Sequence, residues 1–157
     1  MENQPAYRIS SERAIENLIA QYTHFLDRGN FAGVAALFAK GRLISLGEVI
    51  EGAEAVEQLL HRNLQVYVDG TPRTAHVTTN TVLHIDEQED TATALSYLTI
   101  FQQDQDRNFP LQPIMIGRYA DRFARTAGEW HFTERELSLS LPGDLSHHAS
   151  AASQANI

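Results

Sequence analysis

Residues 74–98 read TAHVTTNTVLHIDEQEDTATALSYL, in which a short acidic stretch lies between two runs of strand-forming residues. The runs Thr74–Asp86 and Thr91–Gln103 are rich in β-branched side chains, which favour the extended backbone of a strand. Glu87–Asp90 joins them and predicts a hairpin turn, because antiparallel strands need only a short connection. A long β-hairpin is therefore expected in this part of the chain.

Two further strands are expected after the hairpin. A polar loop, Asp104–Asn108, leads to the strand Pro113–Arg125, and the turn Thr126–Gly128 leads to the strand Glu129–Leu141. Long neighbouring strands with short turns predict an antiparallel meander. The chain then loses apolar content, so residues 142–157 are expected to form a flexible C-terminal tail.

Helical periodicity precedes the hairpin. Ser10 or Ser11 can cap a helix that ends near Gly29, and a shorter helix is expected between Asn30 and Gly41. The first helix has an apolar stripe at helical spacing, formed by Ile15, Leu18, Ile19, Tyr22 and Leu26. This stripe predicts the side of the helix that faces the core.

Two short strands and a third helix complete the N-terminal half. Arg42–Leu46 and Glu48–Glu51 have the pattern of strands, and Ala53–Val66 has the pattern of a helix. Helices that precede strands along the chain predict an α+β fold, with the helices on one face of a curved sheet. The length of 157 residues fits one domain, expected over residues 10–141 after a flexible N-terminus at residues 1–9.

Composition excludes several classes of protein. The chain has no cysteine, so disulfides, thiolate metal sites and cysteine nucleophiles are ruled out. Its net charge of −8, from 12 basic and 20 acidic side chains, argues against a nucleic acid or an anionic membrane as partner. No segment has the ~20 apolar residues of a membrane span, and the N-terminus lacks an apolar signal core. We therefore expect a soluble, cytoplasmic protein.

Four local patterns follow one another in an order typical of one protein family. They are IENLIAQYTHFLDRGNFAGVAALF at Ile15–Phe38, IEGAEAV at Ile50–Val56, the hairpin at Thr74–Leu98 and GEWHFTERELS at Gly128–Ser138. Together they resemble the SnoaL-like branch of the nuclear transport factor 2-like superfamily, over residues 10–141. The resemblance implies a cystatin-like α+β barrel, in which a cone-shaped antiparallel sheet wraps around three N-terminal helices and encloses an apolar pocket.

The resemblance also implies a catalytic site. Dehydratases and dehydrohalogenases of the superfamily, scytalone dehydratase among them, use a histidine base that an aspartate orients inside a deep apolar cone. By position, the aspartate is Asp27 and the histidine is His76. Tyr22 stands where the dehydratases have a tyrosine, and Arg135 matches the arginine that follows the closing tryptophan.

These four side chains suit one kind of chemistry. An imidazole titrates near neutrality, and a carboxylate on its second nitrogen fixes the tautomer, so His76 and Asp27 suit proton abstraction. Tyr22 can donate to a leaving hydroxyl or an enolate oxygen, and Arg135 can stabilise negative charge. A core tyrosine and an ion-paired sheet arginine are the alternatives for these two. We expect a lyase or isomerase without metal or organic cofactor, acting on a small apolar, cyclic molecule.

The residue pattern alone favours another interpretation of the aspartate and the histidine. Asp27 lies about 100° from the centre of the apolar stripe and close to the helix end, where solvated or capping carboxylates are common. His76 shares a strand face with polar residues, opposite Val77, Leu83 and Ile85, so simple alternation places it in solvent. Their expected pairing therefore rests on the family resemblance.

Five further residues are expected to line the substrate pocket, namely Asn80, Tyr97, Phe101, Met115 and Tyr119. Each is also compatible with an ordinary core or interface position. The remaining histidines, including His147 and His148 in the expected tail, have no spacing that indicates a metal site.

Two non-catalytic functions fit the same sequence. The cone can hold a ligand without chemistry, or the chain can be a structural subunit of a larger complex. Members of the superfamily often dimerise through the sheet, which implies a homodimer or higher homo-oligomer. Leu98, Ile114 and Ile116 are the residues expected on the outer, apolar face of the sheet.

Overall fold

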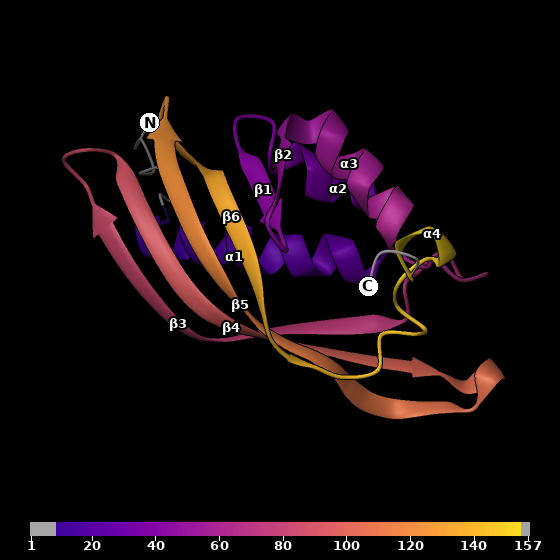
Figure 1. Ribbon diagram of the computed structural model, residues 1–157. Helices are drawn as coiled ribbons and strands as arrows, with labels where there is room; N and C mark the ends of the chain where they lie inside the picture. The colour runs from indigo at the N-terminus through magenta and orange to yellow at the C-terminus, as the bar shows by residue number, and fades with distance from the viewer. Residues whose placement is uncertain (1–8, 155–157) are drawn as a thin grey trace, which may run out of the picture.

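The computed structural model describes residues 9–154, and these contain one curved sheet of six strands in the order β2-β1-β6-β5-β4-β3 (Figure 1). The strands are β1 Arg42–Ser45, β2 Glu48–Glu51, β3 Thr74–Asp86, β4 Thr91–Asp104, β5 Phe109–Thr126 and β6 Glu129–Pro142. The hairpin of β3 and β4 is antiparallel, as predicted. All neighbours pair antiparallel except β1 and β6, which are parallel, so the sheet is not antiparallel throughout.

The helices lie on the concave side of the sheet (Figure 1). They are α1 Ser11–Asp27, α2 Phe31–Ala36 and α3 Gly52–Asn63, followed near the C-terminus by the short α4 Ala151–Gln154. A 3-10 turn, η1 Gln105–Arg107, joins β4 to β5. The fold is therefore α+β, as predicted. The sheet is open, with β2 and β3 as its two edges, so the expected barrel is incomplete.

Helix α1 follows its sequence signals closely. The Ser10 hydroxyl accepts a hydrogen bond from the Arg13 N–H, which caps the helix. The predicted stripe is buried at four of its five positions, and Leu18 is half-buried. The chain leaves the helix at Gly29, where φ is +70° and a Cβ would lie 2.1 Å from the carbonyl oxygen of Gly70. Only glycine fits this turn, which fixes the position of the helix end.

A bulge in β3 decides which of its side chains face inward. The pairing register shifts between Thr79 and Val82, and Asn80 has a φ of +54°. One extra residue reverses the alternation, because successive side chains point to opposite faces. His76 before the bulge and Leu83 after it therefore face the same, concave side.

A second bulge, in β6, also changes which side chains face the concave side of the sheet. Its register against β5 shifts between Glu134 and Phe132, which leaves Thr133 as the extra residue. Phe132 and Arg135 are consequently both buried, although their separation of three would place them on opposite faces of a regular strand. Gly41 packs against this bulge, where a Cβ would meet the Phe132 carbonyl oxygen at 2.4 Å.

Several elements begin or end at residues other than the predicted ones. Strand β5 begins at Phe109 instead of Pro113, and α3 ends at Asn63 instead of Val66. Residues 143–154, expected in a flexible tail, pack along α3 and the sheet, where Ala149 forms a bridge with Leu64. Residues 1–8 and 155–157, the rest of the two expected flexible ends, lie outside the described residues. Within the described part of the chain, no helix is long and apolar enough to cross a membrane.

Candidate active site

Asp27 and His76 are in direct contact. The Asp27 Oδ1 atom lies 2.5 Å from His76 Nδ1, and Oδ2 accepts a hydrogen bond of 2.8 Å from the His76 backbone N–H. Oδ1 also accepts from the Thr74 hydroxyl at 2.8 Å. The His76 side chain is only 3% exposed. The structure thus brings together the two residues that simple periodicity placed in solvent.

The edge position of β3 makes this contact possible. An edge strand has backbone N–H groups without a strand partner, and that of His76 is used by the carboxylate at the last residue of α1. Burial on its own raises the pKa of Asp27, but the hydrogen bonds and charge of His76 outweigh burial and hold that pKa below its ordinary value. Asp27 is therefore a carboxylate at neutral pH, suited to stabilise an imidazolium.

An apolar cavity of about 160 Å³ lies beside the His76 ring. Its polar lining comes from Tyr22, Tyr119, His76 and His148, with Ser45, Asn63 and Ser153. Its apolar walls are Leu26, Leu43, Leu46, Leu59, Leu60, Leu64, Leu98, Ile100, Met115, Leu137, Leu145 and Ala149. A larger hollow of about 580 Å³ beside Arg42 and Glu134 is open and has a mainly charged and polar lining, so it does not suit an apolar molecule.

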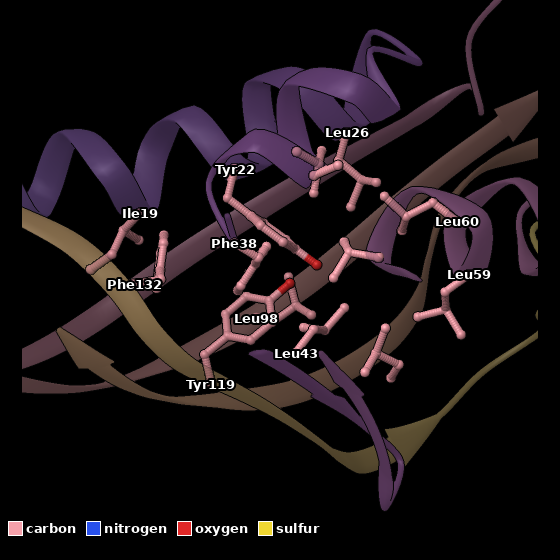
Figure 2. Packing of buried hydrophobic residues seen from close by; sticks show 14 of the residues in the cluster. Ile19, Tyr22, Leu26, Phe38, Leu43, Leu59, Leu60, Leu98, Tyr119 and Phe132 are labelled. Carbon is pink, nitrogen blue, oxygen red and sulfur yellow. The ribbon is translucent and has the colours of Figure 1, made fainter. Parts of the chain in front are cut away.

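Two tyrosines converge at the cavity from opposite sides. Tyr22 comes from α1 and Tyr119 from β5, and Figure 2 shows their hydroxyl groups pointing toward each other. Their rings meet edge to face at 5.8 Å. Burial raises the pKa of both phenols, that of Tyr119 well above its ordinary value. Both therefore stay protonated at neutral pH and can donate hydrogen bonds.

Arg135 lies behind these tyrosines and does not line the cavity. Its Nε and Nη2 donate to the two carboxylate oxygens of Asp121 at 2.8 and 2.7 Å, and both side chains are fully buried. The guanidinium carbon lies 4.3 Å from the Tyr22 ring centre and 4.0 Å from that of Tyr119. The ion pair corrects the expectation that Arg135 clamps a substrate charge directly. Its guanidinium packs against the two tyrosine rings.

Three residues expected in the pocket lie elsewhere. Asn80 occupies the bulge of β3 and is exposed, and Tyr97 accepts a hydrogen bond from Arg118 on the outer face of the sheet. Phe101 shares that outer face, because the even-numbered residues of β4 are the buried ones. Alternation in β4 excludes Tyr97 and Phe101 from the cavity, and the bulge excludes Asn80. Met115 does line the cavity, together with Tyr119.

His148 is the site residue that sequence reasoning missed. It lines the cavity, and its ring centre lies 6.3 Å from that of His76. Its Nδ1 atom is buried and has no hydrogen-bond partner among the described residues. The surrounding sequence, LSHHASAAS, consists mainly of polar and small residues, which is a composition typical of a tail. Leu145, an isolated apolar residue that packs against the core, was the available signal for a docked segment.

No metal site emerges from the described residues, where no group of three or more histidine, aspartate or glutamate side chains is close enough to hold an ion. The expectation of a site without metal or organic cofactor stays a prediction. The ionisable groups at the cavity instead form a set for proton transfer. Asp27 occupies Nδ1 of His76, which leaves Nε2 as the second ring nitrogen of a residue that lines the cavity.

Comparison with protein families gives a match to the SnoaL-like domain over residues 7–136. The match covers most of the sequence, and the chain therefore belongs to the SnoaL-like domain family. Comparison with curated protein sequences gives no significant match.

Solved structures share this fold. A protein of unknown function from Mycobacterium tuberculosis is 22% identical, with a TM-score of 0.68 over 82% of this chain and 76% of its own. A nuclear transport factor 2-like protein with a cystatin-like fold from Novosphingobium aromaticivorans is 24% identical, with a TM-score of 0.67 over 92% and 86%. A protein of the same bacterium, named "Putative Scytalone Dehydratase", is 22% identical, with a TM-score of 0.66 over 85% and 86%. At these identities the likeness shows the fold.

Proposed function

We propose that the protein is a cofactor-independent lyase or isomerase, in which His76 takes a carbon-bound proton from a small apolar, cyclic substrate. The observation that carries this proposal is the contact between Asp27 and His76 Nδ1 at the wall of an apolar cavity. The name of the similar Novosphingobium aromaticivorans structure, which refers to a dehydratase, agrees with it. Apolar walls and a buried dyad strengthen each electrostatic interaction with the reacting atoms.

The proposed chemistry begins at His76 Nε2. This nitrogen accepts the proton from carbon, and the electron pair of the broken C–H bond forms an enolate or a C=C bond. Asp27 stabilises the resulting imidazolium through Nδ1–H. In an elimination the C–O bond breaks, and the leaving hydroxide takes a proton from the imidazolium to become water. In an isomerisation the imidazolium returns the proton to a different carbon. Tyr22 and Tyr119 donate hydrogen bonds to the oxygen on which charge develops.

Exchange of substrate protons with solvent deuterium tests this function before the natural substrate is known. Both reactions begin with the same proton abstraction, so small cyclic ketones are suitable probes. The protein should accelerate deuterium incorporation into the α-position of at least one ketone in such a set, measured by proton NMR in D₂O. Binding of a ketone without any accelerated exchange would instead support a ligand-binding protein without chemistry.

Replacing Asp27 with asparagine should lower the exchange rate by about 10²-fold, because the imidazolium loses its counter-charge. The matched control is Glu16→Gln, which removes a carboxylate from the exposed face of the same helix. The control should exchange at the wild-type rate. An Asp27→Asn variant that keeps full activity would show that the dyad has no catalytic role.

We also propose that the outer face of the sheet forms a homo-oligomer interface. Leu98 and Ile114, expected on that face, are buried in the core instead. Exposed apolar side chains of the outer face include Val77, Val82, Leu95, Tyr97 and Leu141. Exposed clusters of this kind often mark protein contacts. Sedimentation velocity should show a dimer or larger species that Leu95→Lys weakens, and a monomer at micromolar concentration would contradict the proposal.

A further inference from the structure

The segment after β6 is attached to the rest of the protein at several points around the cavity. The Gly143 N–H donates to the Ile114 carbonyl at 2.9 Å. Farther along, the Gln65 N–H donates to the His148 carbonyl at 2.8 Å, and the Ser150 N–H donates to the Asn63 carbonyl at 2.8 Å. These bonds tie the segment to β5 and to the end of α3. The segment is thus a built wall of the cavity, close to α3 in Figure 1.

His147 anchors this wall. Its ring stacks on Phe109 at 4.3 Å, and its Nδ1 lies 3.1 Å from the buried carboxylate of Asp104. Its carbonyl oxygen accepts hydrogen bonds from the Tyr67 hydroxyl and the Gln102 amide. With His147 held on the sheet side by ring and backbone, the next side chain lines the cavity. The position of His148 is therefore fixed by contacts that do not involve its own ring.

His148 has the properties of an unoccupied hydrogen-bonding group. Its Nδ1 is buried and unpartnered within the described chain. Burial and the nearby His76 lower the pKa of His148 to about 4, although the Asp27 carboxylate opposes this effect. Tyr22 and Tyr119 are the other titratable groups on the cavity wall. The ring is consequently neutral at physiological pH, and a buried polar atom without a partner costs stability unless a ligand satisfies it.

We propose that His148 is a second catalytic residue, whose Nδ1–H donates a hydrogen bond to the oxygen of a small cyclic ketone while His76 removes the adjacent α-proton. The proposal rests on the proposed function and specifies its substrate class. The C–H bond breaks toward His76 Nε2, the electrons move onto the carbonyl oxygen, and the Nδ1–H of His148 stabilises the enolate without transferring its proton. A neutral imidazole is an effective donor to such an oxygen.

The separation of the His76 and His148 rings is compatible with one ring contacting the α-proton and the other the carbonyl oxygen. A carbonyl oxygen lies about 2.4 Å from the α-carbon of the same ketone, from standard bond lengths. Each of these atoms needs about 3 Å to its protein partner. The protein atom that contacts the carbonyl oxygen and the one that contacts the α-carbon are then about 5–8 Å apart, depending on the angles at which they approach. The ring centres lie 6.3 Å apart, which is too far for a direct hydrogen bond between the rings and is compatible with nitrogens separated by such a distance.

Nitrogen-15 NMR of histidine-labelled protein tests the proposal without requiring turnover. Cyclohexanone is the probe, and methylcyclohexane, which lacks the oxygen, is its matched control. Cyclohexanone should shift the Nδ1 resonance of His148, and methylcyclohexane should not. A His148 resonance that stays unmoved up to the solubility limit of cyclohexanone overturns the proposal. This result is independent of deuterium exchange, so the binding site and the proposed function can fail separately.

Variants of His148 separate hydrogen bonding from packing. The amide N–H of asparagine can take the place of Nδ1–H, whereas leucine fills similar space without a donor. His148→Leu should bind cyclohexanone about 3–10-fold more weakly, as the loss of one hydrogen bond predicts, and His148→Asn should recover most of the affinity. His131→Asn, on β6 outside the cavity lining, should bind as the wild type does. Equal affinity in His148→Leu and the wild type would overturn the proposal.

Discussion

Replacing His76 with glutamine is expected to lower the rate of ketone deuterium exchange by about 10²–10⁴-fold, the usual contribution of a positioned general base. Glutamine keeps a polar group near the position of Nε2 but cannot accept a proton at neutral pH. The Asp27 carboxylate still accepts from the backbone N–H of residue 76, so α1 should remain docked on β3. Exchange rates by NMR and a urea unfolding curve measure the two effects separately.

The neighbouring histidine of the same strand provides the control. His84 is exposed at the far end of β3, and His84→Gln should leave exchange unchanged. A His76→Gln variant that folds and retains wild-type exchange would exclude His76 as the base. The cavity would then be a binding site whose chemistry, if any, lies with its other polar groups.

Replacing Asp121 with alanine is expected to lower the free energy of unfolding by about 3–5 kcal/mol, because a buried charge loses its partner. Arg135 is fully buried and has Asp121 as its bidentate acceptor. Burial on its own lowers the pKa of Arg135, and in the wild type the charge of Asp121 outweighs burial and raises it. Without Asp121 the guanidinium still keeps its proton, because arginine does not lose its charge in proteins. Urea unfolding followed by far-ultraviolet circular dichroism measures the loss.

The double variant Asp121→Leu with Arg135→Met tests the cause. Removing both charges removes the unpaired ion, so this variant should be more stable than Asp121→Ala alone. It should also exchange ketone protons more slowly than the wild type, because the Tyr22 and Tyr119 rings lose the guanidinium packed between them. A loss below about 1 kcal/mol in Asp121→Ala would place this pair with exposed ion pairs instead.

Local patterns predict the six strands and the first three helices. The stripe from Ile15 to Leu26 encodes the buried face of α1, and Glu87–Asp90 encodes the turn between the first two of the four long predicted strands. The residues that form each of these patterns are close together in the sequence, so the patterns can be recognised from the sequence alone. Family resemblance then added the positions of Asp27 and His76, which periodicity had placed in solvent.

The site itself depends on two β-bulges, which the simple alternation of inward and outward side chains along a strand does not predict. The bulge at Asn80 and the bulge at Thr133 each reverse the facing of a strand, and they bring His76 and Arg135 inward. A bulge depends on pairing with a neighbouring strand, so it has no reliable signal within its own sequence. Asn80 was misplaced for the same reason, since its positive φ marks the bulge itself.

His148 shows a different limit of sequence reasoning. Its segment is poor in apolar residues, and docking relies on contacts of His147 with Asp104 and Phe109 that are some 40 positions away in sequence. Such polar, long-range contacts leave no periodic pattern. The composition of a segment therefore does not establish that it is a tail.

The protonation of the two ring nitrogens of His76 tests the dyad most directly. Nitrogen-15 NMR distinguishes protonated from unprotonated nitrogens in a neutral imidazole. With Asp27 Oδ1 at 2.5 Å from Nδ1, the neutral ring should have its proton on Nδ1 and an unprotonated Nε2, and Asp27→Asn should weaken this preference. A neutral His76 with its proton on Nε2, or a tautomer that Asp27→Asn does not affect, would contradict the role of Asp27 and leave the cavity without an oriented base.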